Sequence, residues 1–269
     1  MSRRNIALTI EYCGISYCGW QIQDNAPTVQ GAVEKALSEL CGENIRVNGC
    51  SRTDTGVHAL EFVLNFYTSS TIPAERFPAA VNSFLPPDIV ALSAKEVPDS
   101  FHARFDARFK TYRYLFDIAP LPSAFLSGRV WNVRLPLPSS DPERSPDASL
   151  KILNEAAGHF IGEHDFSAFR AEGSNVRSTV RTITDASVFF ADAGQLFASV
   201  RGVRPLLCFE VRGNGFLYNM VRIMAGTLMD VYKGKIAPGD IPSIIDSKDR
   251  TRAGMTAPPD GLYLFKVEY

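Results

Sequence analysis

The spacing of apolar residues in the first hundred positions predicts strands alternating with two helices. Period-two patterns indicate strands at residues 6–12, 45–49, 60–66 and 89–97. A stripe at helical spacing follows Thr28, which can cap the first turn, and it ends at Gly42. A second, less regular helix is expected after Pro73, where Pro78 interrupts a stripe made of Phe77, Val81 and Phe84. This part of the chain is expected to form one α+β unit.

The same order of elements starts again in the second part of the chain. Strands are expected at 111–118, 180–190, 206–211 and 262–269, with Tyr112, Tyr114 and Phe116 on one face of the first. Helices are expected after Asp147, as N-cap, and over 216–232, and the Pro/Ser-rich stretch 135–146 is interpreted as a surface loop. We therefore expect two α+β domains, residues 1–105 and 106–269, each a sheet backed by helices.

Composition narrows the class of protein. The 269 residues are 45% apolar and 21% charged, which is typical of globular chains and not of disordered ones. No run approaches the roughly 18 apolar residues of a membrane span, and no secretory signal is recognised. Five cysteines without a C-x-x-C pair argue against a disulfide framework and against a zinc ribbon. A cytoplasmic protein with free thiols and no membrane contact is expected.

Charge gives a mixed indication about nucleic acids. The net charge of -1 does not suggest a phosphate-rich partner, because proteins that bind nucleic acids usually carry a basic excess. Between residues 101 and 115, however, only Asp106 opposes four basic side chains, Arg104, Arg108, Lys110 and Arg113. Such a local basic strip can attract phosphates although the whole chain is nearly neutral.

The densest polar cluster lies between the second and third predicted strands, in the sequence Cys50-Ser-Arg-Thr-Asp-Thr-Gly-Val-His58. Asp and Thr side chains that bond to nearby N–H groups, followed by a glycine, are typical of an ordinary turn. The same loop can instead present the carboxylate of Asp54 at the end of a sheet, where a nucleophile or general base would act. Both interpretations remain open on spacing alone.

The tripeptide Asp54-Thr55-Gly56 also occurs in aspartic proteases. Those enzymes need two carboxylates that share a proton, so this chain, with one such tripeptide, would have to act as a homodimer. A cation at Arg52 would favour two ionised carboxylates and disturb the shared proton. The protease hypothesis is therefore disfavoured.

Three further groups are candidates for binding or catalysis. His159 and His164 are five residues apart and do not share a helix face, so no metal site is expected from them. The sequence 213–215, Gly-Asn-Gly, is placed at the start of the long helix, where free N–H groups could hold a phosphate or simply allow a flexible entry. Arg222 lies on the same helix, one turn from Tyr218 and Gly226. Because that helix is apolar nearly all round, the cation must be paired, line a cleft or extend to solvent.

Several blocks of the sequence together resemble the tRNA pseudouridine synthase A family. Its signature R-T-D-x-G-V-H-A is matched by residues 52–59. Further matches run in the family's order along the whole chain, at residues 12–21, 101–104, 111–114, 165–170, 219–222 and 261–264. Two positions depart from the pattern: Cys13 stands where an acidic residue is usual, and Ser51 where glycine often precedes the arginine.

This resemblance implies a fold, a reaction and a partner. Members have two RRM-like (ferredoxin-like) halves with mainly antiparallel sheets, joined side by side with the catalytic cleft between them, and they act as homodimers. They isomerise uridine to pseudouridine at positions 38, 39 and 40 in the anticodon arm of tRNA, by base flipping and without metal or cofactor. RNA recognised by shape suits an enzyme that acts on several adjacent positions.

The resemblance also implies roles for particular residues. Asp54 would be the nucleophile, attacking either C1′ or C6, and Arg222 would form an ion pair that keeps its carboxylate ionised. Tyr112 would stack on the flipped base and help to remove the C5 proton. The remaining substrate contacts would be an inserted arginine, a close backbone approach, a loop-orienting imidazole and an apolar contact to the base, from Arg52, Gly56, His58 and Leu262 respectively.

Three function classes compete: an RNA-modifying isomerase, an RNA-binding module without catalysis, and a dimeric aspartic protease. A binding module would keep its function when Asp54 is replaced by alanine, whereas the isomerase would lose turnover and still bind tRNA, since phosphate contacts supply most of the affinity. A protease would cleave polypeptides at acidic pH. The isomerase is the interpretation that the sequence favours.

Overall fold

The computed structural model describes residues 3–133, 146–173, 176–191 and 206–269. The chain divides into two compact units, one formed by Met1–Lys110 with Tyr263–Tyr269 and the other by Thr111–Leu262. The division expected from the sequence, after residue 105, differs from this mainly because the last strand belongs with the first unit. Within the described ranges no helix has the length and apolar character to cross a membrane.

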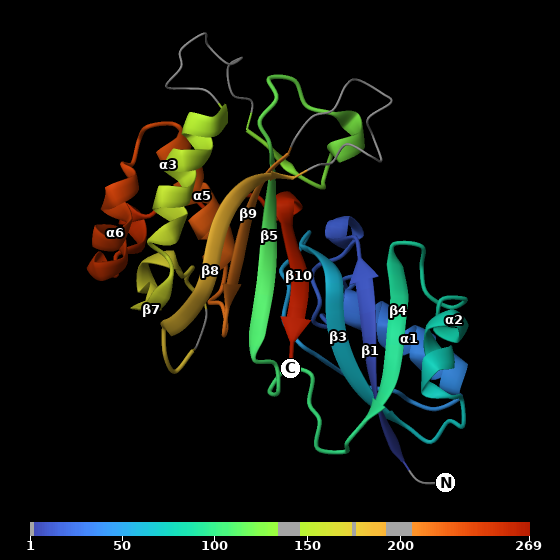
Figure 1. Cartoon of the computed structure of the whole chain (residues 1–269). Helices are drawn as coiled ribbons and strands as arrows, with labels where there is room; N and C mark the ends of the chain where they lie inside the picture. Colours follow the sequence, from blue (N-terminus) through green and yellow to red (C-terminus); the bar gives the residue numbers. More distant parts are fainter. Residues whose placement is uncertain (1–2, 134–145, 174–175, 192–205) are drawn as a thin grey trace. The chain divides into compact units, whose positions relative to one another are not determined.

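The first unit is built on a mostly antiparallel sheet (Figure 1). Strand β1 (Arg4–Tyr12) lies between β3 (His58–Thr68) and β4 (Ile89–Val97) and is antiparallel to both. The other edge of β3 carries β2 (Val47–Gly49), antiparallel, and then β10 (Leu262–Glu268), which runs parallel to it. All four strands predicted for this part of the chain are confirmed.

Helix α1 (Val29–Cys41) has the ends that the sequence predicts. The Thr28 hydroxyl accepts a hydrogen bond from the Gly31 N–H at 3.3 Å, and Gly42 ends the helix with a φ of 67°. These two caps satisfy backbone groups that a helix end leaves without partners. The apolar stripe of α1 is buried through Val29, Val33, Ala36 and Leu37.

The second predicted helix is shorter than expected. A 3-10 turn (Ala74–Arg76) precedes α2 (Phe77–Val81), and Pro78 occupies the second position of α2, where no backbone N–H is needed. Pro78 therefore helps to start the helix and does not interrupt it. Phe84 was expected on the buried stripe, but it lies beyond the helix and is 45% exposed.

The second unit repeats the combination of sheet and helices. Strand β8 (Val180–Ala191) is antiparallel to β9 (Leu206–Gly213) and to β7 (Gly162–Asp165), and β9 is followed in the sheet by β5 (Phe109–Asp117). The short strand β6 (Trp131–Asn132) pairs with β5. Helices α3 (Pro146–Gly158), α5 (Met220–Tyr232) and α6 (Ile241–Ser247) lie together beside β8 in Figure 1. Four phenylalanines fill the core: Phe160, Phe166, Phe169 and Phe209.

Two helix starts in this unit differ from the sequence prediction. Asp147 is in the first turn of α3, which begins at Pro146, so it is not the N-cap. Helix α5 begins at Met220 and not at 216, because Asn219 adopts a left-handed conformation with φ 60° immediately before it. The Gly-Asn-Gly sequence at 213–215 therefore follows strand β9 and is not a helix start. The loop predicted at 135–146 lies almost entirely outside the described residues.

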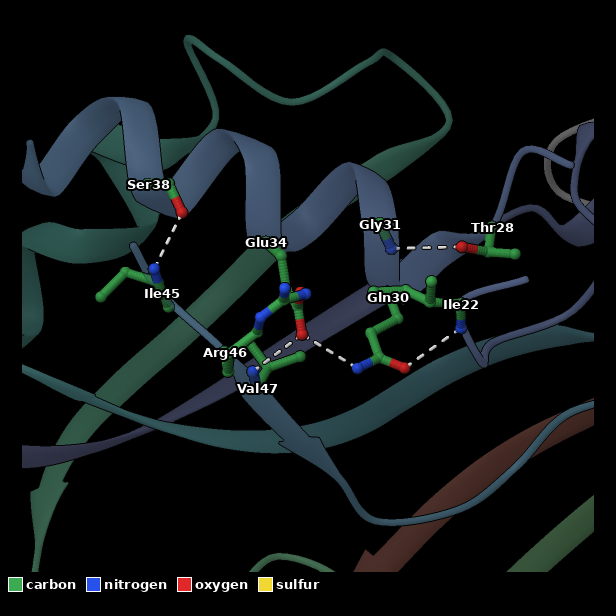
Figure 2. Close-up of polar contacts among 9 residues, drawn as sticks. All are labelled: Ile22, Thr28, Gln30, Gly31, Glu34, Ser38, Ile45, Arg46 and Val47. Atoms are coloured by element: carbon green, nitrogen blue, oxygen red, sulfur yellow. Dashed lines mark hydrogen bonds and ion pairs between the residues drawn. The ribbon is translucent and has the colours of Figure 1, made fainter. Parts of the chain in front are cut away.

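A buried carboxylate ties α1 to β2 (Figure 2). Glu34 is 6% exposed, and its side chain accepts hydrogen bonds from the Val47 N–H at 3.1 Å, from Arg46 at 2.7 Å and from Gln30 at 2.9 Å. Gln30 in turn accepts a bond from the Ile22 N–H. A buried carboxylate is tolerated only when its oxygens are satisfied in this way. The network fixes β2, from which the polar loop of residues 50–58 departs.

Replacing Glu34 by alanine should lower the free energy of unfolding by about 1–3 kcal/mol, because the buried Val47 N–H loses its acceptor. The urea midpoint of the purified protein measures this. Glu39→Ala is the control, since Glu39 lies on the same helix, is half exposed and forms only a long 4.0 Å ion pair with Lys35. Equal midpoints for the two variants would show that the network does not support the fold.

Candidate active site

The polar loop of residues 50–58 leaves β2 and enters β3 through a tight turn. The Cys50 N–H donates to the Val63 carbonyl at 2.9 Å, and the Val57 N–H donates to the Asp54 carbonyl at 3.1 Å. Gly56 has a φ of 80°, which favours glycine. The turn leaves Asp54 half-buried and Arg52 exposed, while His58 is buried. The loop is thus a turn of ordinary geometry that also carries the half-buried Asp54 side chain.

A second segment, residues 12–20, is hydrogen-bonded to the backbone of this loop. The Trp20 N–H donates to the Thr53 carbonyl at 3.1 Å, and the Gly56 N–H donates to the Tyr17 carbonyl at 3.4 Å. The hydroxyls of Tyr12 and Thr53 are 2.8 Å apart and hydrogen-bonded. We call this segment the clamp. These contacts hold the residues on both sides of Asp54.

Two glycines of the clamp make the close approach possible. A Cβ on Gly14 would collide with the Val57 carbonyl oxygen, and a Cβ on Gly19 would lie 2.5 Å from the Thr53 carbonyl oxygen. Gly19 also has a φ of 86°, which other residues adopt only with strain. The glycines of the block at 12–21 are therefore required by the packing of two backbones.

His58 connects the clamp to the last strand. Its Nδ1 accepts a hydrogen bond from the Gly14 N–H at 3.1 Å, so the neutral ring carries its proton on Nε2. The ring stacks on Tyr263 of β10, with centroids 4.6 Å apart and planes 19° from parallel. These two contacts of the buried imidazole support the local structure.

Lys110 holds the start of the loop. Its ammonium group donates to the Cys50 carbonyl at 2.6 Å, and burial, with a further contribution from Arg104, lowers the pKa of Lys110. Burial also raises the pKa of the Cys50 thiol to about 12. The thiol is therefore protonated at neutral pH and does not act as a nucleophile. Sequence reasoning placed Lys110 only in the basic strip; its sequence neighbours gave no signal of this contact.

In the second unit, Arg222 of α5 is oriented by hydrogen bonds. Its Nε donates to the Ala257 carbonyl at 2.7 Å and a terminal nitrogen donates to the Asn219 side chain at 2.8 Å. The guanidinium is half-buried and does not simply extend into solvent. Tyr218, expected one turn away on the same helix, instead precedes α5 and is 45% exposed.

The segment that receives Arg222 packs unusually closely on α5. A Cβ on Gly226 would collide with the Met255 carbonyl oxygen, and a Cβ on Gly254 would lie 2.6 Å from the backbone of Thr227. The Thr227 hydroxyl accepts from the Gly254 N–H at 2.9 Å, and the Ala257 N–H donates to the Arg222 carbonyl at 3.1 Å. This close contact places the Ala257 carbonyl within reach of the guanidinium.

Tyr112 lies on β5 with its neighbours on the predicted buried face. Its ring is 7% exposed and meets Phe216 edge-on at 5.0 Å. Tyr114, two residues on, is fully buried and donates its hydroxyl to the Pro258 carbonyl at 2.7 Å. A Cβ on Gly261 would lie 2.7 Å from the Tyr114 ring, so glycine is needed just before Leu262, which is 7% exposed.

The predicted site residues thus fall into two groups. The first unit brings together the four residues of one loop, Arg52, Asp54, Gly56 and His58, and the second unit holds Tyr112, Arg222 and Leu262. No group of three or more His, Cys, Asp or Glu side chains suited to a metal ion occurs among the residues that the structure describes. His164 of the candidate metal pair has its Nε2 3.1 Å from the Ile161 carbonyl.

Gly14→Ala should destabilise the protein by about 1–3 kcal/mol and loosen the Asp54 loop, because the added methyl group forces the two backbones apart. We would measure the urea midpoint and the hydrogen exchange of the Gly56 and Val57 amides. Gly239→Ala, where a Cβ would meet open space, is the control. Unchanged exchange in the Gly14 variant would contradict the clamp.

Comparison with known proteins identifies the family to which the chain belongs. Residues 8–106 and 156–269 match the family described as tRNA pseudouridine synthase. The chain is 48% identical over 266 residues to tRNA pseudouridine synthase A of Ruminiclostridium cellulolyticum and, equally, to that of Acetivibrio thermocellus, in each case over 99% of this chain and all of the relative. It is 42% identical to tRNA pseudouridine synthase A 2 of Clostridium tetani, over 99% of both chains. The chain therefore belongs to the tRNA pseudouridine synthase family, whose members are isomerases that act on tRNA.

Proposed function

We propose that this protein converts uridine to pseudouridine at positions 38, 39 and 40 of the tRNA anticodon stem-loop, with Asp54 as the nucleophile. The observation that supports this most directly is the clamp, which fixes the backbone on both sides of Asp54. A nucleophile held in place before the substrate arrives needs little reorganisation during the reaction.

The reaction balances without a cofactor. The C1′–N1 bond of uridine breaks, the uracil turns, and C5 is joined to C1′. C5 loses its proton and N1, freed from C1′, gains one, so the product is an isomer of the substrate and no electrons are exchanged with a further group. Attack of Asp54 at C1′ and attack at C6 both satisfy this balance.

Arg222 is proposed as the ion-pair partner of Asp54. Its guanidinium is oriented by the Ala257 carbonyl and the Asn219 side chain, and a cation with a fixed direction is suited to holding a carboxylate ionised. Tyr112 is proposed to stack on the flipped base and to assist removal of the C5 proton. The edge contact with Phe216 supports this, because it fixes the plane of the tyrosine ring.

The other four substrate contacts follow from where their residues lie. Arg52 is exposed on the loop and is proposed to enter the space that the flipped base leaves. Gly56 allows RNA to approach the backbone, and Leu262 packs against the base. His58 is proposed to orient the loop, since its ring already bonds Gly14 and stacks on β10.

We also propose RRM-like halves, a homodimer and a cytoplasmic location. For the first unit, the element order β1-α1-β2-β3-α2-β4 supports the RRM-like arrangement, because the sheet order β4-β1-β3-β2 is that of a split βαβ fold. Such sheets are common platforms for RNA. A homodimer would double the basic surface available to a near-neutral chain, and tRNA is a cytoplasmic substrate.

Asp54→Asn should abolish tritium release from tRNA labelled at uracil C5, while the affinity for tRNA stays within a few-fold of the wild type. The amide keeps the shape of the loop but is not a nucleophile. Asp24→Asn, at an exposed carboxylate of the same unit, is the matched control and should release tritium normally. Mapping the product in sequence would show which of positions 38, 39 and 40 react.

Equal release by Asp54→Asn and the wild type would leave the reaction intact and remove Asp54 from the chemistry. Tight tRNA binding without release by either protein would favour a binding module.

Arg222→Met should slow the single-turnover reaction by about 10- to 1000-fold, since a preorganised charge contact is lost. The loss should be greater at low pH than at high pH, because the carboxylate is then held ionised less well. Arg222→Lys should recover part of the rate. Arg76→Met, at an exposed arginine of the first unit, controls for lost positive charge. A loss that does not vary with pH would argue against the ion pair.

A further inference from the structure

The loop of residues 98–106, between β4 and β5, is anchored to the sheet by two buried asparagines. Asn5 and Asn65 are 1% and 0% exposed and are hydrogen-bonded to each other at 2.9 Å. The Asn5 amide also donates to the carbonyls of Pro98 and Phe101, both at 3.0 Å, and Asn65 accepts from the Ala103 N–H at 2.9 Å. Two core positions of the sheet therefore serve to hold a surface loop.

Two tyrosines fix the same loop from its sides. The Tyr67 hydroxyl donates to the Asp99 carbonyl at 2.7 Å, and the Tyr269 hydroxyl donates to the Ala103 carbonyl at 2.8 Å. The Tyr269 ring also packs on Phe101, with centroids 5.1 Å apart. The loop is thus held at several points along its length, and its tip has a defined conformation.

The tip presents three flat side chains, His102, Arg104 and Phe105, which we call the stacking triad. Phe105 is 73% exposed, with its ring centroid 4.3 Å from that of His102 and 5.6 Å from the guanidinium carbon of Arg104. The turn is closed by bonds from the Phe105 N–H to the His102 carbonyl and from the His102 N–H to Asp106. A third bond runs from the Arg104 N–H to the His102 ring.

The exposure of Phe105 is not explained by the fold. Its exposed fraction is the largest of any large hydrophobic side chain in the described ranges. A single exposed apolar residue is common and needs no function. Here, however, a phenyl ring, an imidazole and a guanidinium gather on a loop that the core holds rigidly. Aromatic rings and arginine planes are the groups on which unpaired bases stack.

Two exposed arginines lie close to the triad along the chain. Arg104 on this loop and Arg108 just beyond it are exposed, while Lys110 is engaged with the Cys50 carbonyl. The acidic residues of the segment, Asp99 and Asp106, are exposed as well, and the Asp106 carboxylate accepts a bond from the His102 N–H. A flat apolar surface bordered by two arginines complements a base with its flanking phosphates.

The loop of the triad and the clamp are attached to opposite ends of β1. The clamp begins at Tyr12, at one end of β1, whereas the loop of residues 98–106 is bound by Asn5, seven residues away on the same strand. At the rise of a β-strand, Asn5 and Tyr12 lie roughly 20 Å apart along β1. The triad would therefore contact a nucleotide other than the one that is isomerised.

We propose that the stacking triad binds an unpaired base of the tRNA, with the neighbouring phosphates on Arg104 and Arg108, as a second recognition site for the substrate. This rests on the proposed function, because it takes tRNA as the partner. It adds a base-stacking contact that holds the RNA at one end of the first unit's sheet while the target nucleotide is processed at the other.

The test measures the dissociation constant of unmodified full-length tRNA for variants of the whole protein over a range of salt. Phe105→Ala should weaken binding roughly 5- to 100-fold at every salt concentration, because stacking is not an ionic contact. Phe105→Trp should bind at least as tightly as the wild type. Arg104→Gln should weaken binding and also lower the salt slope by about one.

Phe84→Ala is the matched control, since it removes a phenylalanine of the same unit that is 45% exposed and lies outside the triad, and it should bind like the wild type. The urea midpoint of Phe105→Ala should equal that of the wild type. Ultraviolet crosslinking of tRNA should attach a nucleotide to the 102–105 segment.

The outcomes separate this proposal from the proposed function. Wild-type protein that isomerises tRNA while Phe105→Ala binds it equally tightly would overturn the stacking triad alone. Protein that binds tRNA through Phe105 without tritium release would support the triad and overturn the isomerase. Loss of dimerisation in Phe105→Ala, seen by sedimentation without tRNA and with unchanged tRNA affinity, would show that a second copy of the chain covers the surface instead.

Discussion

Direct contact between two backbones is the constraint on which the first unit's site depends. The clamp reaches the Asp54 loop only because Gly14 and Gly19 have no side chains, so that peptide groups can bond to peptide groups. Hydrogen bonds between peptide groups involve no rotatable side chain. They therefore position the loop, and the side chain that it carries, more accurately than bonds made by long polar side chains could. The backbone on both sides of Asp54, the proposed nucleophile, is thus held in place although it belongs to a loop.

In the second unit, Arg222 is also positioned through close contact between two backbones, which glycines make possible. Gly226 and Gly254 let the segment around Met255 lie directly on α5, and this brings the Ala257 carbonyl to Arg222. Backbone atoms thus help to position both residues of the proposed ion pair: they hold the chain on both sides of Asp54, and together with the Asn219 side chain they orient the Arg222 guanidinium. Membership of an isomerase family that acts on tRNA also removes the aspartic protease as an interpretation of Asp54-Thr55-Gly56, whose glycine serves the turn.

The sequence predicted the elements well where periodicity governs them and less well where single residues decide. Strands such as β1 and the capped helix α1 follow from patterns of burial that any core imposes. The start of α5 was wrong by four residues because Asn219 takes a left-handed conformation that composition does not reveal. For the site, the 52–59 signature located the loop, but the contact between Lys110 and Cys50 joins positions 60 residues apart. Contacts of that range leave no local pattern in one sequence.

The place of β10 has a consequence for how the protein is made. Residues 111–262 separate Lys110 from Tyr263, so a ribosome must translate the whole second unit before the first unit receives the strand that pairs with β3. Until then His58 lacks the Tyr263 ring on which it stacks, and the Ala103 carbonyl lacks the hydrogen bond from the Tyr269 hydroxyl. Long-range closure of this kind is slow. The nascent first unit would therefore emerge with both its 50–58 loop and its 98–106 loop incompletely supported, and would mature only after the last strand has been added.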